Sequence, residues 1–190
     1  MRLFVAITVS EALRAELFAL QKRLEQAKAE VRWVKPEQYH ITVKFIGEAA
    51  DDQLVQIAAR MDSAAAATEP FKLDIIGLDR IESRGKVRVI TAEVNSPDQR
   101  LTRLHRQVDQ KLAGMGFDLD MRELLPHITL GRVQSNHGLN RLLRRLEHFS
   151  PDAMEPISGW EVVDVHLFQS TLTPEGSEYK ILHTAKLGSV

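Results

Sequence analysis

The sequence of 190 residues contains no cysteine. Disulfide bonds, thiolate nucleophiles and cysteine-ligated zinc or iron are therefore excluded from the chemistry of this chain. A chain without thiols fits easily in a reducing compartment. We expect the protein to be cytoplasmic.

The sequence also lacks an excess of either charge. Lys and Arg together number 25 and Asp and Glu number 26, so the formal net charge is -1. A protein that coats nucleic acid through bulk charge needs many clustered cations, because its affinity comes from released counterions. Any contact with nucleic acid should therefore be local.

The first apolar run, residues 3–9, is far too short to span a membrane. Glu11, Arg14 and Glu16 follow it at the point where a signal peptide would continue or be cut. We therefore expect a soluble protein with no membrane partner.

A hydrophobic content of 44% allows a chain of this length to bury a sizeable core. No proline-rich or serine-rich linker divides the sequence. We expect residues 1–190 to form one domain of two lobes and to act as a monomer.

Apolar runs and alternating stretches predict strands at 2–9, 31–34, 39–47, 71–78, 86–94, 124–133, 159–170 and 178–187. Helical spacing of apolar residues predicts helices after Ser10, from Leu54, from Leu101 and over 139–149. The order is mixed and hairpins are prominent. An α+β fold with antiparallel sheet is therefore favoured over a doubly wound fold.

Two of the helix starts carry capping signals. Ser10 is the expected N-cap of the first helix. Ahead of Leu101, Ser96 is the expected N-cap, Pro97 the first helical residue and Gln99 the capping-box partner.

One short pattern occurs twice, as YHITVKF at 39–45 and as PHITLGR at 126–132. Each copy lies on a predicted strand that is followed by a predicted helix. This duplication indicates two similar lobes that face each other.

Strand geometry divides each copy between two faces, because successive side chains alternate. In the first copy His40 and Thr42 share a face, and Ile41 lies on the other. In the second copy His127 and Thr129 share a face in the same way. Each motif therefore has an aliphatic face that anchors the strand and a polar face that is free for other contacts.

The two polar faces suit acid-base chemistry on an anion. Histidine titrates near pH 6.5, so one ring can be neutral while the other is protonated. Threonine hydroxyls donate hydrogen bonds to anionic oxygens. A base, an acid and two such donors describe in-line attack on a phosphodiester, for which no metal or other cofactor is needed.

Two other interpretations remain open at this point. A single histidine on a strand is more often structural than catalytic, although only two of the seven histidines are followed by threonine at the second position. His40, His127 and a third ligand could instead bind zinc, but no HExxH pattern or short-spaced ligand set is present.

With these motifs the sequence resembles the 2H phosphoesterase superfamily, and within it the RNA 2′,3′-cyclic phosphodiesterases, also known as 2′-5′ RNA ligases. The resemblance covers nearly the whole chain and extends to these segments: RLFVAI, HITVKFIGE, KVRVITAEV, PHITLGRV and LFQSTLTPEGSEYKIL. It implies an α+β, bilobal fold with two antiparallel sheets and flanking helices related by pseudo-two-fold symmetry around a central cleft.

The resemblance further implies hydrolysis of a 2′,3′-cyclic phosphate at an RNA or nucleotide end to a 2′-phosphate, with 2′-5′ ligation as the reverse capacity. His40 would then be the proton donor to the departing 3′ oxygen, and His127 the proton acceptor that activates water. Thr42 and Thr129 would hold the non-bridging oxygens. A small cyclic phosphate as the substrate, or a non-catalytic RNA-binding module, are the alternatives.

Three further residues have expected places near the cleft. Many relatives carry an aromatic residue where this chain has Thr91, so Phe168 is the remaining candidate for stacking on a base. Regular alternation turns Arg132 away from His127, and only a bend at Gly131 would bring it to the phosphate. Lys44 shares the parity of His40, which predicts either the cleft or a solvated strand end.

Overall fold

The computed structural model describes residues 1–174 and 176–188, with the side chain of Ser158 left out. The α-helices in these residues are α1 (Glu11–Glu25), α2 (Leu54–Ala66), α3 (Arg100–Ala113) and α4 (Leu139–Glu147), and the 3₁₀ helices are η1 (Pro36–Gln38) and η2 (Asp51–Gln53). The strands are β1 (Arg2–Thr8), β2 (Val31–Trp33), β3 (His40–Glu48), β4 (Phe71–Ser83), β5 (Lys86–Asn95), β6 (His127–Val133), β7 (Ile157–Val162), β8 (Asp164–Thr173) and β9 (Gly176–Lys186).

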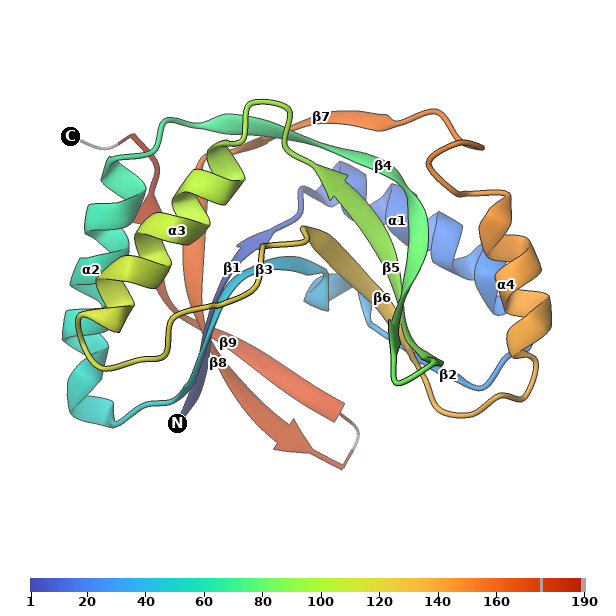
Figure 1. Ribbon diagram of the computed structural model, residues 1–190, viewed down its shortest axis with the longest axis horizontal. Helices are drawn as coiled ribbons and strands as arrows, with labels where there is room; N and C mark the ends of the chain where they lie inside the picture. The colour runs from blue at the N-terminus through green and yellow to red at the C-terminus, as the bar shows by residue number, and fades with distance from the viewer. Residues whose placement is uncertain (175, 189–190) are drawn as a thin grey trace.

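The strands form one antiparallel sheet in the order β7-β4-β5-β6-β3-β1-β8-β9, with β2 paired to β6 (Figure 1). The first half-sheet consists of β3, β1, β8 and β9, and the second of β6, β5, β4 and β7 with β2. The register joins them through one residue pair, Ile41 opposite Ile128. The predicted α+β fold with antiparallel sheet is confirmed, and the two expected sheets join at this pair.

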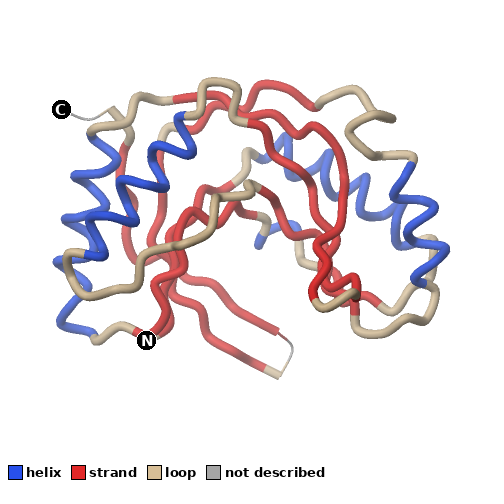
Figure 2. Tube along the Cα trace, in the orientation of Figure 1, coloured by secondary structure: helices blue, strands red, loops and turns tan. Residues whose placement is uncertain are grey.

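Helices cover one face of each half-sheet, as Figure 2 shows. α2 and α3 pack together against the first half-sheet, whereas α1 and α4 pack together on the second. Each half-sheet thus has a buried face below its helices. Among the described residues, no helix has both the length and the apolar character needed to cross a membrane.

The first helix begins as its sequence predicts. Ser10 has an extended backbone, and its hydroxyl accepts a hydrogen bond from the Leu13 amide at 3.2 Å. The predicted hairpin is also confirmed and is longer than expected, since β4 and β5 continue to a turn at Arg84 and Gly85. Both turn residues have positive φ, which is the requirement of a type I′ hairpin turn.

The predicted start of α3 is wrong in detail. Residues 96–99 form a turn, and the helix begins at Arg100 after Gln99, which adopts the left-handed conformation. The Asp98 carboxylate accepts a hydrogen bond from the Arg100 amide at 3.0 Å, and the Ser96 hydroxyl accepts one from the Leu101 amide at 3.4 Å, so both side chains cap the helix start. Pro97 therefore precedes the helix.

The prediction of a single strand at 159–170 is also wrong. The structure divides it at Val163, so that β7 pairs with β4 in the second half-sheet and β8 pairs with β1 in the first. Buried apolar residues continue through the crossing, with Val162 in β7 and Val165 and Leu167 in β8. Sequence periodicity therefore gives no sign that the chain changes partner there.

β-Bulges interrupt the alternation of both motif strands. Val5 pairs with Lys44 and Ala6 with Thr42, so Val43 is the extra residue in β3. In β6 the extra residue is Leu130, because Ile90 pairs with Gly131 and Thr91 with Thr129. Each bulge reverses the parity of the residues after it.

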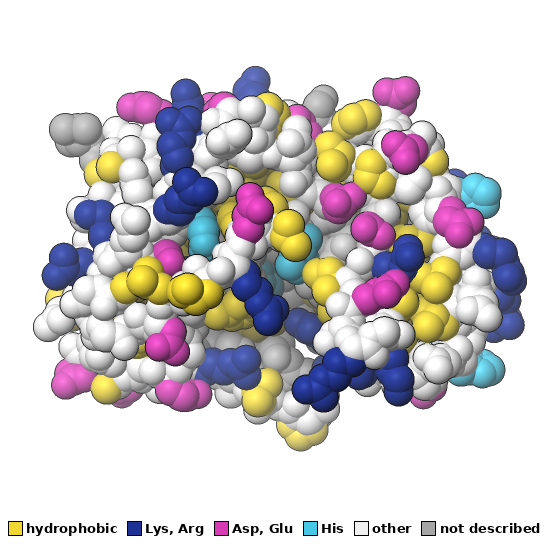
Figure 3. Space-filling model, viewed as in Figure 1, with side chains coloured by type: hydrophobic (Ala, Val, Ile, Leu, Met, Phe, Trp, Pro, Cys, Tyr) yellow, Lys and Arg dark blue, Asp and Glu magenta, His cyan; other side chains and the backbone are white. Residues whose placement is uncertain are grey.

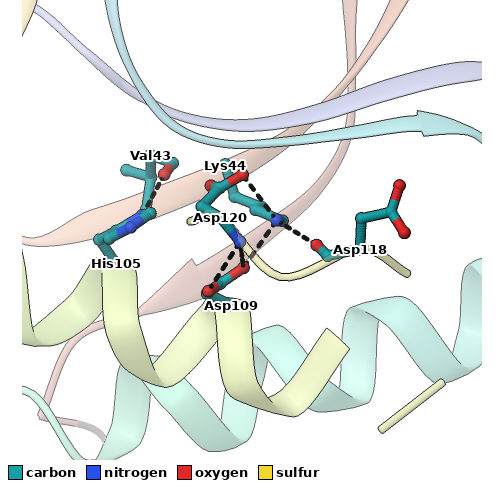
Figure 4. A network of polar contacts seen from close by, with 6 residues as sticks. All are labelled: Val43, Lys44, His105, Asp109, Asp118 and Asp120. Atoms are coloured by element: carbon teal, nitrogen blue, oxygen red, sulfur yellow. Dashed lines mark hydrogen bonds and ion pairs between the residues drawn. The ribbon is translucent and has the colours of Figure 1, made fainter. Parts of the chain in front are cut away.

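The β3 bulge directs Lys44 toward α3, where its side chain is 2% exposed (Figure 4). Both positions expected for it, the cleft and a solvated strand end, are therefore wrong. Its ammonium group lies 2.6 Å from the Asp109 carboxylate and 3.0 Å from that of Asp120, and it donates a hydrogen bond to the Asp118 carbonyl at 2.6 Å. Burial alone lowers the pKa of Lys44, but the two carboxylates outweigh it and hold the pKa above its ordinary value.

A second contact from α3 holds the other bulge residue. The His105 ring donates through Nδ1 to the carbonyl oxygen of Val43 at 2.7 Å. His105 and Asp109 are four residues apart, so they lie on one face of α3 and reach Val43 and Lys44 together (Figure 4). The bulge is thus fixed by α3 together with the loop that follows it.

Replacement of Lys44 by methionine is expected to lower the free energy of unfolding by about 3 to 5 kcal/mol, because it leaves two carboxylates without their cation. The measurement is urea denaturation of the two proteins. The control is Lys22→Met, which removes an exposed ion pair with Glu25 at 2.8 Å and should cost at most about 1 kcal/mol. Equal losses in the two variants would contradict the assigned role of the buried network.

Candidate active site

The junction of the two half-sheets brings the two motifs together. Ile41 and Ile128 are fully buried opposite each other. Because β3 and β6 run antiparallel, this register directs His40 toward Thr129 and Thr42 toward His127 on the other face. The four polar side chains therefore alternate around one point.

All four line one cleft of about 580 Å³. Its further walls include Phe45, Trp33 and the hairpin of β8 and β9. Figure 3 shows a hollow near the middle of the face where the two half-sheets meet, with Lys and Arg side chains around it. The duplicated motif thus serves one site.

Both histidines are held by the same local contact. Nδ1 of His40 lies 2.7 Å from the Gln38 carbonyl oxygen, and Nδ1 of His127 lies 2.8 Å from the Leu125 carbonyl oxygen. A carbonyl oxygen only accepts, so Nδ1 carries the hydrogen in each ring. Nε2 of each ring is left to take or give a proton.

The surroundings of His40 favour its neutral form in the free protein. Burial lowers the pKa of this ring, and the positive charges of His127 and Arg132 lower it further, against the hydrogen bond to Gln38, which raises it. An anion bound in the cleft would act in the opposite direction, because it stabilises the imidazolium.

Arg132 lines the cleft together with the four motif residues. Regular alternation predicted the opposite, and the bulge at Leu130 supplies the bend that this prediction lacked. A Cβ atom on Gly131 would lie 2.6 Å from Val31 and 2.8 Å from the Trp33 ring, so a side chain at this position would displace β2. The close packing of Gly131 thus keeps Trp33 in the cleft wall.

Phe168 lies beside the site and is not one of the walls of this cleft. Its ring is 7% exposed and stacks on Phe4 with centroids 5.1 Å apart and planes 11° apart. It lines a neighbouring pocket that also contains His40. Thr91 is buried and donates to the Asp79 carbonyl at 3.2 Å, so it offers no stacking surface.

Tyr179 is an aromatic residue that the sequence patterns did not identify. Its ring meets that of His40 edge-on with centroids 5.3 Å apart, and it lines both the cleft and the neighbouring pocket. The register of β8 and β9 brings Tyr179 to the site, because Tyr179 pairs with Ser170, two residues from Phe168. That register could not be read from the sequence.

The cleft has a local excess of positive charge in a chain whose net charge is -1. Its basic lining residues are Arg2, Arg32, Lys35 and Arg132, and its acidic lining residue is Glu178. The cations extend on both sides of the histidines because Arg2 belongs to β1 and Arg32 to β2. Such a cleft attracts an extended anion.

The zinc alternative finds no support in the described part of the chain. No group of three or more His, Asp or Glu side chains there is arranged to hold a metal ion. His40 and His127 consequently have no third ligand among these residues.

An antiparallel fold that brings two His-x-Thr motifs to one cleft defines the class of 2H phosphoesterases. Within this class, the chain belongs to the family described as LigT like phosphoesterase, whose model matches residues 7–91 and 93–179. Both motifs fall within the matched residues.

Relatives of similar length align with this sequence almost from end to end. A protein of Archaeoglobus fulgidus is 34% identical over 183 residues, which are 96% of this chain and 98% of the relative. A protein of Methanocaldococcus jannaschii is 29% identical over 182 residues, with coverage of 96% and 98%. Both are named RNA 2′,3′-cyclic phosphodiesterase.

Solved structures share the fold. A protein of Thermus thermophilus superposes with a TM-score of 0.81 at 24% identity, with 99% of this chain and 98% of that one covered. Escherichia coli LigT in complex with 3′-AMP has a TM-score of 0.75 at 19% identity, with the same coverage. At these identities the likeness establishes the fold alone.

Replacement of Arg132 by glutamine is expected to raise the pKa of His40, because it removes a positive charge that disfavours the imidazolium. In the unsubstituted protein, His40 is expected to titrate below its ordinary value of 6.5. NMR titration of the ring signals measures both. Arg60→Gln, on the exposed face of α2, is the control and should leave the pKa of His40 unchanged.

Two results would contradict this electrostatic description of the site. One is titration of His40 at or above 6.5 in the free protein. The other is an Arg132→Gln variant in which the pKa of His40 falls or stays the same.

Proposed function

We propose that this protein hydrolyses 2′,3′-cyclic phosphate at the end of RNA or of a nucleotide to a 2′-phosphomonoester, by metal-independent acid-base catalysis. One observation carries the proposal. The register at Ile41 and Ile128 directs two imidazoles and two hydroxyls into one basic cleft. The relatives named above support the choice of substrate.

In the proposed reaction, Nε2 of neutral His127 takes a proton from a water molecule as its oxygen attacks phosphorus. The bond between phosphorus and the 3′ oxygen breaks in line with the attack. Nε2 of protonated His40 gives its proton to the departing 3′ oxygen, which becomes a hydroxyl group. The phosphate remains on the 2′ oxygen.

The non-bridging oxygens need stabilisation as negative charge builds up on them. The Thr42 and Thr129 hydroxyls are proposed to donate hydrogen bonds to these oxygens, and Arg132 balances their charge. The bound anion also raises the pKa of His40, which the free protein holds low. Substrate binding therefore supplies the protonated acid that the step needs.

The same site could join two RNA ends. If the 5′-hydroxyl of a second strand replaces water, His127 takes its proton and its oxygen attacks the cyclic phosphate. The 3′ oxygen leaves with a proton from His40, and the product is a 2′-5′ phosphodiester. This reverse capacity is part of the proposal.

The spread of positive charge favours a polymer over a small cyclic phosphate. Arg2, Arg32 and Lys35 lie on the cleft walls in addition to Arg132, and a single phosphate does not need them all. Phe168 and Tyr179 provide aromatic surface beside His40. We further propose that the protein acts as a cytoplasmic monomer, since one chain supplies the whole cleft.

Replacement of either His40 or His127 by alanine is expected to lower the rate on a cyclic-phosphate oligonucleotide by roughly 10²- to 10⁴-fold, because each change removes one proton transfer. A substrate with sulfur as the 3′ bridging atom separates the two roles, since a thiolate leaves without a proton. Sulfur should restore much of the rate to His40→Ala and little of it to His127→Ala. The measurement is release of the 2′-phosphate product.

His148→Ala is the matched control, because His148 belongs to a similar-looking triplet, HFS, but ends α4 on the protein surface. It should keep the full rate. Full activity of the double variant His40→Ala, His127→Ala would disprove the proposed function. Rescue of His127→Ala by sulfur would reverse the assignment of donor and acceptor.

A further inference from the structure

A second cavity of about 590 Å³ adjoins the cleft beside His40, and we call it the Arg14 pocket. It shares Gln38, His40, Glu178 and Tyr179 with the cleft. A ligand held at the two motifs can therefore extend past His40 into this pocket without leaving the protein surface. The function proposed above gives Arg14 and Glu37 of this pocket no role.

One wall of the Arg14 pocket is aromatic and apolar, and consists of Phe168, Tyr179 and Ile181. Phe168 is fixed by its stack on Phe4. Tyr179 is fixed by its edge-on contact with the Phe4 ring, at 5.1 Å between centroids. A rigid aromatic wall suits a flat ligand that stacks.

Arg14, in the first turn of α1, adds a positive charge to the lining of the pocket. Its Nε atom is buried and has no hydrogen-bond partner among the described residues. Buried donors are almost always paired in folded proteins. Because Arg14 lines the pocket, a movement of its side chain toward a ligand would bring this donor to an acceptor.

The charges that line this pocket disfavour a phosphate group as its ligand. The carboxylates of Glu37 and Glu178 also line the pocket, so acidic side chains outnumber the one arginine. Two carboxylates repel an anion, but they accept hydrogen bonds from N–H groups. The pocket therefore suits a flat, neutral ligand with acceptors on one edge and donors on another.

We propose that the Arg14 pocket binds the base of the terminal nucleotide, and that this base is guanine. This inference rests on the proposed function, in which the 3′ oxygen, and with it the terminal ribose, lies at His40. Guanine places O6 and N7 side by side as acceptors for an arginine fork. Its N1–H and N2–H groups lie on the next edge and suit a carboxylate of Glu37 or Glu178.

The other bases match this set of groups less well. Adenine has an amino group beside N7, which opposes the guanidinium donors. Cytosine likewise presents an amino group where guanine presents O6. Uracil has one ring N–H and no neighbouring amino group, so it satisfies a carboxylate only once.

The test uses four oligonucleotides that end in 2′,3′-cyclic phosphate and differ only in the last base. The expected kcat/KM is highest for guanine, by roughly 10- to 100-fold over adenine, since one bidentate pair supplies discrimination of that order. Arg14→Met should lower kcat/KM for guanine to the value for adenine and leave the adenine value unchanged. Lys22→Met, an exposed cation on the same helix, should keep the preference.

The wild-type comparison needs no variant, so it stands even if Arg14→Met fails to fold. Equal cleavage of all four substrates, or preference for another base, would overturn this inference and leave the proposed function intact. A guanine preference that survives in folded Arg14→Met would also overturn it. Cleavage of none of the four would overturn the proposed function, and this inference with it.

Discussion

The site depends on one backbone pairing, Ile41 opposite Ile128. These two residues carry the register by which the half-sheets meet, and both are fully buried. Because the strands are antiparallel, burial of this pair turns the two histidines and two threonines to the other face. A slip by one residue would bury the polar set and expose the aliphatic one. Stability and chemistry are therefore specified by the same register.

The bulges after the two motifs extend this arrangement and make the two halves of the cleft different. Each bulge buries two successive residues and returns the next one to the cleft, which places Phe45 on one side and Arg132 on the other. In β3 the second buried residue is Lys44, held by α3, and in β6 it is Gly131, packed against β2. One duplicated pattern thus supplies a pair of similar acid-base groups within unequal surroundings.

Much of this could be predicted from the sequence, because it depends on local patterns. The α+β class, the hairpin of β4 and β5 and the strand alternation of both motifs follow from spacing alone. Tertiary pairing decided the rest. Because of the bulges, the predicted positions of Lys44 and Arg132 were wrong. The change of partner at Val163 leaves no sign of a strand boundary in the sequence, and Tyr179 reaches the site only through the register of β8 and β9. These features depend on which strands meet, and one strand's pattern does not contain that information.

The two motifs are proposed to act on one phosphate. A crystal structure with a bound nucleoside 2′-phosphate tests it most directly. We expect phosphate oxygens within hydrogen-bond distance, roughly 2.6 to 3.2 Å, of Nε2 of both His40 and His127 and of the hydroxyls of Thr42 and Thr129. A phosphate bound elsewhere in the cleft, or in contact with only one of the two motifs, would contradict it.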